Sequence, residues 1–397
     1  MHRPERADQA GRLMAAAAQA LGAGDAAGAR ERLRRAVEFD PGALPAWLNL
    51  AAACNALADL DGAMAAIEGA LKLDPRNFLA LLGKARVLER QGKARPAAIA
   101  YGVALAQAPP DDRLDAGALK AVRRAREVSS RYTSDLEAFI HTDMADQLGR
   151  TRGAEARRIG AFVEIALRKR RSYPQQPVEF HYPGLPAIEF YERDEFPWLE
   201  QFEASTDAIR EELLAILRED AGRFVPYVDY PDSVPLDQWR ELNHSLRWGA
   251  YHLLAQGERV EENCRRCPST LEALARIPQP QVQRRSPAAM FSALQPRTRI
   301  PPHTGIANTR LVVHLPLVVP AGCGFRVGGE TREWREGEDW VFDDTIEHEA
   351  WNDSDDVRVI LICDIWSPRL SEDERTLIAG VMAAMDRFND AQPSPGL

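Results

Sequence analysis

The stretch IPPHTGIANTRLVVHLPLVVP, residues 300–320, marks the point where the chain changes from helical to β-rich patterns. Within it, the apolar residues Leu311, Val313, Leu315 and Leu317 recur at every second position, so they would share one face of a strand. A period of two is typical of a β-strand, and further short apolar segments divided by Gly, Asp and Asn continue as far as residue 366. Many short strands in succession predict a β-sandwich or small barrel of the jelly-roll or cupin kind.

Two histidines stand at the edges of these predicted strands, at positions that can meet at one mouth of such a barrel. His303 precedes a strand, and His348 lies in the later run FDDTIEHEAWNDSDDVRVILICDIW, residues 342–366. Two imidazoles that face an open cavity suit Fe(II), for which a carboxylate commonly supplies a third ligand. That acid usually follows the first histidine by two residues, where this sequence has Gly305. From the residues alone, the pair is either an iron site or two structural histidines.

A charged residue, Arg358, stands inside the otherwise apolar strand VRVILICDIW, on the same face as Ile360 and Ile362. A buried guanidinium needs an anionic partner, because an unpaired buried charge is very costly. A dicarboxylate co-substrate would supply one through a bidentate, charge-assisted pair. The alternative is an internal salt bridge to one of the nearby aspartates: Asp343, Asp344 or Asp364.

The first part of the chain repeats with a period of 34 residues. Small and turn-forming residues recur at this spacing, including Pro41, Pro75 and Pro109, and Ala29, Ala63 and Ala97. Alanines at fixed places let two helices cross closely, and a proline ends the second helix of each unit. The pattern resembles the tetratricopeptide repeat and predicts an α-helical solenoid. Such arrays present a concave surface, which we expect to bind a peptide or protein partner.

Two further changes of pattern divide the rest of the chain. Residues 111–175 stay helix-like without the repeat, and proline and tyrosine in RSYPQQPVEFHYPGLP then break the helical pattern. We therefore expect repeats over residues 1–110, a helical connecting segment over 111–175, and over 176–397 a domain of β-strands with flanking helices.

The composition excludes several classes of protein. A formal net charge of -9 argues against a broad nucleic-acid surface. No apolar run approaches the roughly 18 residues that span a bilayer, and the N-terminus lacks the layout of a signal peptide. These features predict a cytoplasmic location without a membrane span. The 5 cysteines do not form a disulfide framework, and Cys264 and Cys267 are spaced like half of a zinc site that no second pair completes.

The runs HTGIANTRLVVHLPLVVP and GGETREWREGEDWVFDDTIEHEAWNDSDDVRVILICDIWSPRL resemble the aspartyl/asparaginyl β-hydroxylases. These are oxygenases that depend on Fe(II) and 2-oxoglutarate and have a double-stranded β-helix fold. The resemblance covers roughly residues 178–372 and is densest over 291–370. The family binds iron through two histidines and has glycine where related oxygenases place the acid, so Gly305 becomes a signature of it.

Carried over residue by residue, the resemblance implies a role for five side chains. His303 and His348 would ligate iron. Arg358 would pair with the distal carboxylate of 2-oxoglutarate, helped by the hydroxyl of Ser292. His314 would contact the carboxylate nearer the metal.

The sequence departs from the animal members of this family in three ways. They carry an arginine two residues before the position of His314, where this chain has Val312; Arg310 would compensate only if its strand face permits. They have a membrane anchor, which we do not expect here. They also have a cysteine pair that forms a disulfide, near Cys264 and Cys267 but with wider spacing.

The resemblance thus predicts a 2-oxoglutarate-dependent dioxygenase that uses O2 to hydroxylate an unactivated C–H. The expected substrate is the β-carbon of an Asp/Asn-type residue in a peptide or protein recruited by the repeats. Two alternatives stay open. One is a catalytically inactive repeat adaptor whose β domain only binds a ligand, and the other is a hydroxylase of lipid acyl chains.

Overall fold

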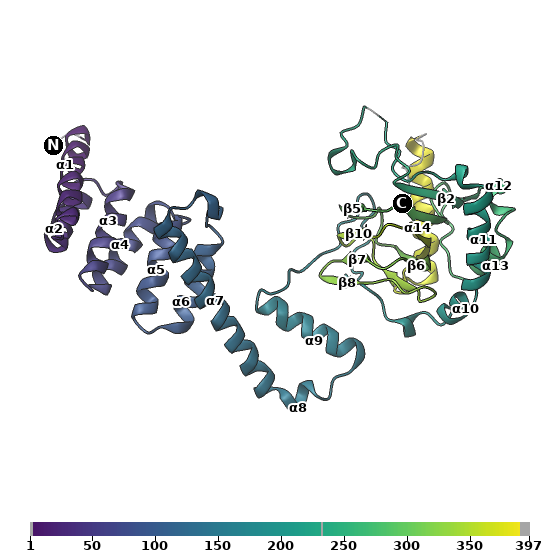
Figure 1. Ribbon diagram of the computed structural model, residues 1–397, viewed down its shortest axis with the longest axis horizontal. Helices are drawn as coiled ribbons and strands as arrows, with labels where there is room; N and C mark the ends of the chain where they lie inside the picture. The colour runs from purple at the N-terminus through teal and green to yellow at the C-terminus, as the bar shows by residue number, and fades with distance from the viewer. Residues whose placement is uncertain (1–2, 232, 390–397) are drawn as a thin grey trace. The chain divides into compact units, whose positions relative to one another are not determined.

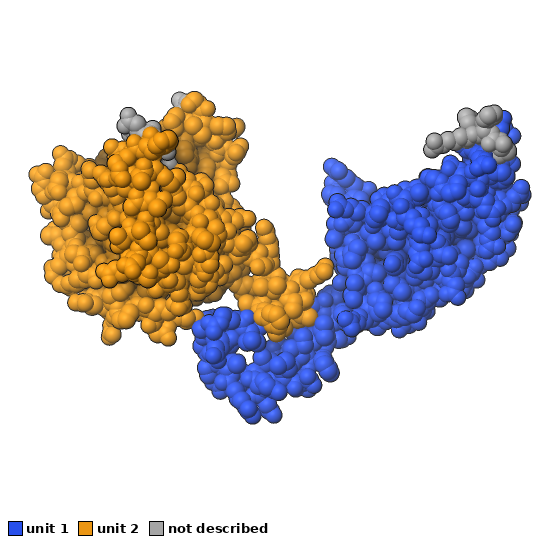
Figure 2. Space-filling view, turned by 180° about the vertical axis from the view of Figure 1, so that it is seen from behind, with its two compact units in different colours: residues 1–159 blue, residues 160–397 orange. Residues whose placement is uncertain are grey.

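The structure is a computed structural model that describes residues 3–231 and 233–389. Contacts divide the chain into two compact units, residues 1–159 and 160–397, which Figure 2 shows in different colours. The limits at residues 110 and 175 that the sequence predicts remain predictions. Among the described residues, no helix combines the length and the apolar character needed to cross a membrane.

The N-terminal unit is built from paired helices (Figure 1). The helices of the repeats are α1 (Arg3–Gly22), α2 (Ala26–Phe39), α3 (Leu44–Ala56), α4 (Leu60–Leu73), α5 (Phe78–Arg90) and α6 (Ala94–Leu105). They are followed by α7 (Ala116–Asp143), α8 (Ala145–Leu148) and α9 (Gly153–Ala166). Alanines at the repeated positions are buried between the helices, as in the predicted solenoid.

The repeated glycines have a local cause at the start of the second helices α2 and α4, whereas α6 begins without a side-chain cap. The carboxylate of Asp25 accepts a hydrogen bond from the backbone N–H of Gly28 at 2.7 Å, and Asp59 accepts one from Gly62 at 2.8 Å. A Cβ atom at Gly28 would lie 2.0 Å from the Asp25 carboxylate, so a side chain there would require the carboxylate to shift. The period therefore reflects capping as well as helix crossing.

The C-terminal unit consists of two antiparallel sheets with helices on one side. In the described residues, the larger sheet has seven strands in the order β1-β2-β4-β11-β6-β9, with β3 beside β2, and the smaller has four in the order β5-β10-β7-β8. The larger sheet contains β1 (Val225–Pro226), β2 (Trp248–Ala255), β3 (Glu258–Arg259), β4 (Ala289–Leu294), β6 (Arg310–Val318), β9 (Trp340–Phe342) and β11 (Arg358–Trp366). The smaller contains β5 (Thr298–His303), β7 (Cys323–Val327), β8 (Glu330–Arg332) and β10 (His348–Asn352).

Helices cover the outer face of the larger sheet. They are α10 (Leu199–Glu203), α11 (Thr206–Glu219), α12 (Glu261–Cys264) and α13 (Pro268–Leu274); α14 (Glu372–Asn389) follows the last strand. Figure 1 shows α11 beside α13, and the two helices contact each other.

The alternation in β6 separates two hydrophobic clusters. Leu311 and Val313 pack with α11 and α13, whereas Val312 belongs to a second cluster between the two sheets. The cluster between the sheets also contains Ile360 and Ile362 of β11, on the face predicted for Arg358. The strand pattern from the sequence thus correctly separates the helix-covered face from the inner face.

Candidate active site

A cavity of about 640 Å³ opens on the inner face of the larger sheet. Its lining includes all five side chains that the sequence selects: Ser292, His303, His314, His348 and Arg358. They come from both sheets and are brought together only by the fold. Their roles remain predictions, but their proximity is a finding of the structure.

The two histidines are direct neighbours across β5 and β10. His303 pairs with His348 in the strand register, and their ring centroids lie 4.1 Å apart. The Nδ1 atom of His303 lies 2.8 Å from the carbonyl oxygen of Pro301, and that of His348 lies 3.0 Å from the carbonyl oxygen of Ile346. A carbonyl only accepts, so each Nδ1 carries the proton and each Nε2 keeps a lone pair for a metal.

Burial keeps both imidazoles neutral. Desolvation and the neighbouring His348 hold the pKa of His303 well below its usual value. Desolvation lowers the pKa of His348 to about 4. A neutral imidazole is the form that ligates a metal, so the pair fits an Fe(II) site.

Gly305 has a structural reason to lack a side chain. Its N–H donates to the backbone carbonyl of Asp344 at 2.7 Å, and a Cβ atom on it would lie 2.0 Å from the Asp344 Oδ2. The space that a third ligand at residue 305 would need is therefore filled by Asp344. Within residues 3–231 and 233–389, no group of three or more His, Cys, Asp and Glu side chains is arranged to hold a metal. The pair of histidines would leave the other positions on the metal to co-substrate, water or oxygen.

Asp344 itself is buried beside the histidine pair. Its Oδ2 accepts a hydrogen bond from Arg310 at 3.4 Å, and its Oδ1 has no hydrogen-bond partner. Burial raises the pKa of this carboxyl group, and the charge of Arg310 opposes that rise. Arg310 faces the same side of β6 as Val312, but its charge is directed at Asp344.

Arg358 is a fully buried cation at the other end of the cavity, with a side chain only 1% exposed. Its Nη1 donates to the carbonyl oxygen of Ser292 at 3.4 Å, and its guanidinium lies 4.7 Å from the centroid of the Trp334 ring. Its Nε has no hydrogen-bond partner within residues 3–231 and 233–389. Desolvation lowers its pKa to about 10, so it is charged at neutral pH. Such a group fits the carboxylate of a bound anion.

The aspartates considered as internal salt-bridge partners of Arg358 form hydrogen bonds with other residues. Asp343 accepts from the hydroxyl of Thr345 at 2.6 Å, and Asp364 accepts from the hydroxyl of Ser286, also at 2.6 Å. In the part of the chain that the structure describes, Arg358 forms no ion pair. The alternative of an internal partner is therefore not supported by the geometry.

Two polar side chains accompany Arg358 in the lining. The indole N–H of Trp248 donates to the hydroxyl oxygen of Ser292 at 3.0 Å, which leaves the Ser292 proton free to donate to a ligand. The Nδ1 of His314 has no partner among the described residues, and burial and Arg358 hold its pKa well below the usual value. Sequence reasoning missed Trp248, because no local motif indicates a hydrogen bond across two strands.

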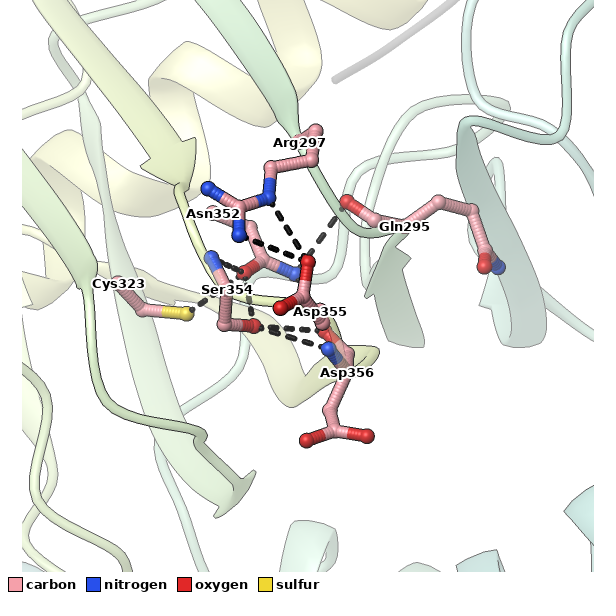
Figure 3. A network of polar contacts seen from close by, with 7 residues as sticks. All are labelled: Gln295, Arg297, Cys323, Asn352, Ser354, Asp355 and Asp356. Atoms are coloured by element: carbon pink, nitrogen blue, oxygen red, sulfur yellow. Dashed lines mark hydrogen bonds and ion pairs between the residues drawn. The ribbon is translucent and has the colours of Figure 1, made fainter.

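A buried asparagine connects two strands and a loop next to this site (Figure 3). The side-chain amide of Asn352 donates to the carbonyl oxygens of Leu294, Gln295 and Asp356 at 2.9, 3.2 and 2.8 Å. Its Oδ1 accepts from the hydroxyl of Ser354 at 2.6 Å. The end of β10 is thus tied to the end of β4 and to the loop that leads into Arg358. Sequence reasoning also missed this residue.

The 5 cysteines are free and buried thiols. The Sγ of Cys264 donates to the carbonyl oxygen of Leu253 at 3.2 Å, and burial raises the pKa of Cys267 to about 12. Cys264 and Cys267, which lie near the disulfide pair of the animal family members but are more closely spaced, form no disulfide in the structure.

Two parts of the chain are similar to known protein families. Residues 203–368 match the family model described as Aspartyl/asparaginyl beta-hydroxylase, and residues 20–69 match that of the tetratricopeptide repeat. Among solved structures, the Arabidopsis OM64 TPR domain is similar over 31% of this chain and 98% of that chain, with 20% identity and a TM-score of 0.28.

Two curated relatives are similar to the C-terminal unit. Human aspartyl/asparaginyl beta-hydroxylase is 34% identical over 184 residues, which cover 46% of this chain and 23% of the human protein. The ornithine lipid ester-linked acyl 2-hydroxylase of Rhizobium tropici is 34% identical over 188 residues, which cover 47% of this chain and 62% of that protein. The chain thus spans less than two thirds of the length of either relative.

Proposed function

From the match of residues 203–368 to the aspartyl/asparaginyl β-hydroxylase family model, we propose that the protein is a dioxygenase dependent on Fe(II) and 2-oxoglutarate. The proposed reaction is hydroxylation of an unactivated C–H, at the β-carbon of an Asp/Asn-type residue in a peptide or protein. The single observation that carries the proposal is Arg358, a buried guanidinium without an anion, in the same cavity as two paired, neutral histidines.

Each residue of the site would perform a distinct task. The Nε2 atoms of His303 and His348 would hold the metal, and their protonated Nδ1 atoms fix the ring orientation. Arg358 and the Ser292 hydroxyl would bind the distal carboxylate of 2-oxoglutarate, and His314 would donate to the carboxylate nearer the metal. When bound, iron and 2-oxoglutarate supply the oxidising chemistry, with O2 consumed and succinate and CO2 released. The apolar walls exclude water from the reacting carbon.

Two other functions receive less support. An inactive adaptor would have no use for a buried, unpaired Arg358 facing a cavity, which costs stability unless an anion binds. A lipid acyl-chain hydroxylase is suggested by the name of the Rhizobium tropici relative. The tetratricopeptide repeats favour a peptide or protein substrate, since stacked repeats present a surface for such segments. Free, buried thiols are compatible with a cytoplasmic enzyme, which we propose.

The histidine pair is tested by removing both ligands. The His303→Ala, His348→Ala double variant is expected to bind Fe(II) at least about 100-fold more weakly, because no other protein ligand is proposed. Iron content and iron-dependent succinate release from 2-oxoglutarate are the measurements. His252→Ala is the matched control, because His252 lines the same cavity but is not a proposed ligand. Iron retained in the double variant, or metal bound by an Asp or Glu side chain, would contradict the assignment.

The repeats are expected to be dispensable for the chemistry. The C-terminal unit has its own hydrophobic clusters, separate from those of the helical repeats. A chain beginning at Gly160 keeps Arg170, which pairs with Glu189, and should bind 2-oxoglutarate within about threefold of the full chain. Use of the natural substrate should fall, because the repeats would no longer recruit it. A folded Gly160–Leu397 chain that cannot bind 2-oxoglutarate would refute this division.

A further inference from the structure

We infer that the side chain hydroxylated at this site is uncharged, and that Asp344 selects a carboxamide such as that of asparagine over a carboxylate. This rests on the proposed function and concerns the part of the cavity that the co-substrate leaves free. A cavity of about 640 Å³ has room for a substrate side chain beside 2-oxoglutarate.

The cavity offers no free cation to an acidic substrate. Among the described residues of its lining, the guanidinium groups are those of Arg285 and Arg358. Arg358 lies with Ser292 at the co-substrate end. Arg285 forms ion pairs with Glu179 at 3.4 Å and with Asp386. An acidic side chain near the histidines would therefore remain unpaired.

Near the histidine pair, Asp344 disfavours a substrate carboxylate and favours a group that donates a hydrogen bond. It lines the cavity, and it stacks directly over Gly305, two residues after His303. Its Oδ2 forms an ion pair with Arg310, so this arginine is not available to pair with a substrate carboxylate. Its Oδ1 is a buried acceptor that finds no donor among the described residues, and a ligand N–H would satisfy it. In either protonation state, Asp344 offers no positive charge to a carboxylate.

Much of the remaining lining is apolar, and Thr304, Tyr227 and Gln256 add polar groups without a net charge. Its apolar side chains come from four strands of the larger sheet and nearby loops: Val228, Leu254, Met290, Ile306, Val312 and Ile362. A charge buried against such a wall without a partner is strongly disfavoured. A carboxamide of the same shape carries no net charge, so it can be buried against this lining. Its NH2 group can also donate a hydrogen bond to the Asp344 Oδ1.

The inference is tested on the full chain with Fe(II) and 2-oxoglutarate. The probes are blocked pentapeptides that differ only in a central Asn, Asp or Leu, and octanamide as an acyl probe. Succinate release and a mass gain of one oxygen atom are measured for each. We expect the Asn peptide to have a kcat/KM at least about tenfold above that of its Asp isostere, which corresponds to about 1.4 kcal/mol.

The other outcomes overturn the inference. These are an Asp peptide that is equal or better, a response to octanamide alone, a Leu peptide preferred over Asn, or no peptide that raises succinate release above the rate without a probe. Failure of the proposed function is distinguishable, because it would appear as no iron-dependent succinate release even without a probe.

Two variants locate the selectivity. In Asp344→Asn, the new amide can accept or donate a hydrogen bond, and Arg310 loses its anionic partner. The ratio of kcat/KM for the Asn peptide to that for the Asp peptide should therefore fall by about tenfold or invert. Asp364→Asn is the matched control: it lies near the same arginine, but its carboxylate bonds Ser286 and is not part of this cavity's lining. The control should keep the preference of the unmodified chain. Equal behaviour of the two variants would remove Asp344 from the inference, and melting temperatures show that both are folded.

Discussion

Replacing Arg358 with methionine is expected to weaken 2-oxoglutarate binding by about 30- to 1000-fold. The change removes a charge-assisted, bidentate contact worth on the order of 2–4 kcal/mol. The fold and the histidine pair should be kept, because Arg358 has no ion-pair partner among the described residues that the change would leave unpaired. Titration of 2-oxoglutarate and a melting curve of the same variant are the measurements.

A second arginine of the same cavity provides the control. Arg285 is ion-paired with Asp386 and Glu179, so Arg285→Met should lower the melting temperature and leave 2-oxoglutarate affinity nearly unchanged. The opposite result for Arg358→Met, unchanged affinity with a large fall in melting temperature, would show that its partner is internal. That result would remove the main support for the co-substrate.

Replacing Asn352 with alanine is expected to lower the free energy of unfolding by about 3–5 kcal/mol. Asn352 is 0% exposed, and alanine would remove its amide donor from the carbonyl oxygens of Leu294 and Gln295, while the Asp356 oxygen keeps the Ser354 hydroxyl. Each lost partner of a buried group costs about 1–3 kcal/mol. Leu294 is the cross-strand neighbour of Arg358, so 2-oxoglutarate affinity should fall as well.

Denaturant unfolding and 2-oxoglutarate titration together test this role. Ser354→Ala is the comparison, because it removes one contact of the Asn352 Oδ1 and leaves all three donor contacts. It should cost about 1 kcal/mol. An Asn352→Ala variant that is no less stable than Ser354→Ala would show that the bonds in Figure 3 do not hold the strands together.

The sequence predicts the main outline of the fold because its patterns are local. The alternation around Leu311 and Val313 identifies a strand with two different faces, and that division is what the two hydrophobic clusters show. The period in the first helices reflects caps such as Asp25 on Gly28, which lie within one turn. Both patterns are visible without knowledge of distant contacts.

Only those residues of the site that stand in recognisable sequence motifs could be predicted. His303, His348 and Arg358 stand out by residue type and spacing, and the structure places them in one cavity. Trp248 and Asn352 contact their partners through strand register and loop geometry, which depend on residues far away in the chain. The contact of Asp344 with Gly305 likewise arises where two separate loops meet, so the sequence marks the glycine without its cause.

The proposed site is divided between the two sheets, so the spacing of the sheets sets the distance between its two halves. The histidine pair belongs to the smaller sheet, whereas Ser292, His314 and Arg358 belong to the larger. Facing sheets lie about 10 Å apart, and the side chains between them set that thickness. Phe325 stands between the two groups, 5.0 Å from His314 and 5.9 Å from His348 between ring centroids. The aromatic filling between the sheets would therefore act as a spacer that fixes how far a metal held by the histidine pair stands from a co-substrate anchored at Arg358.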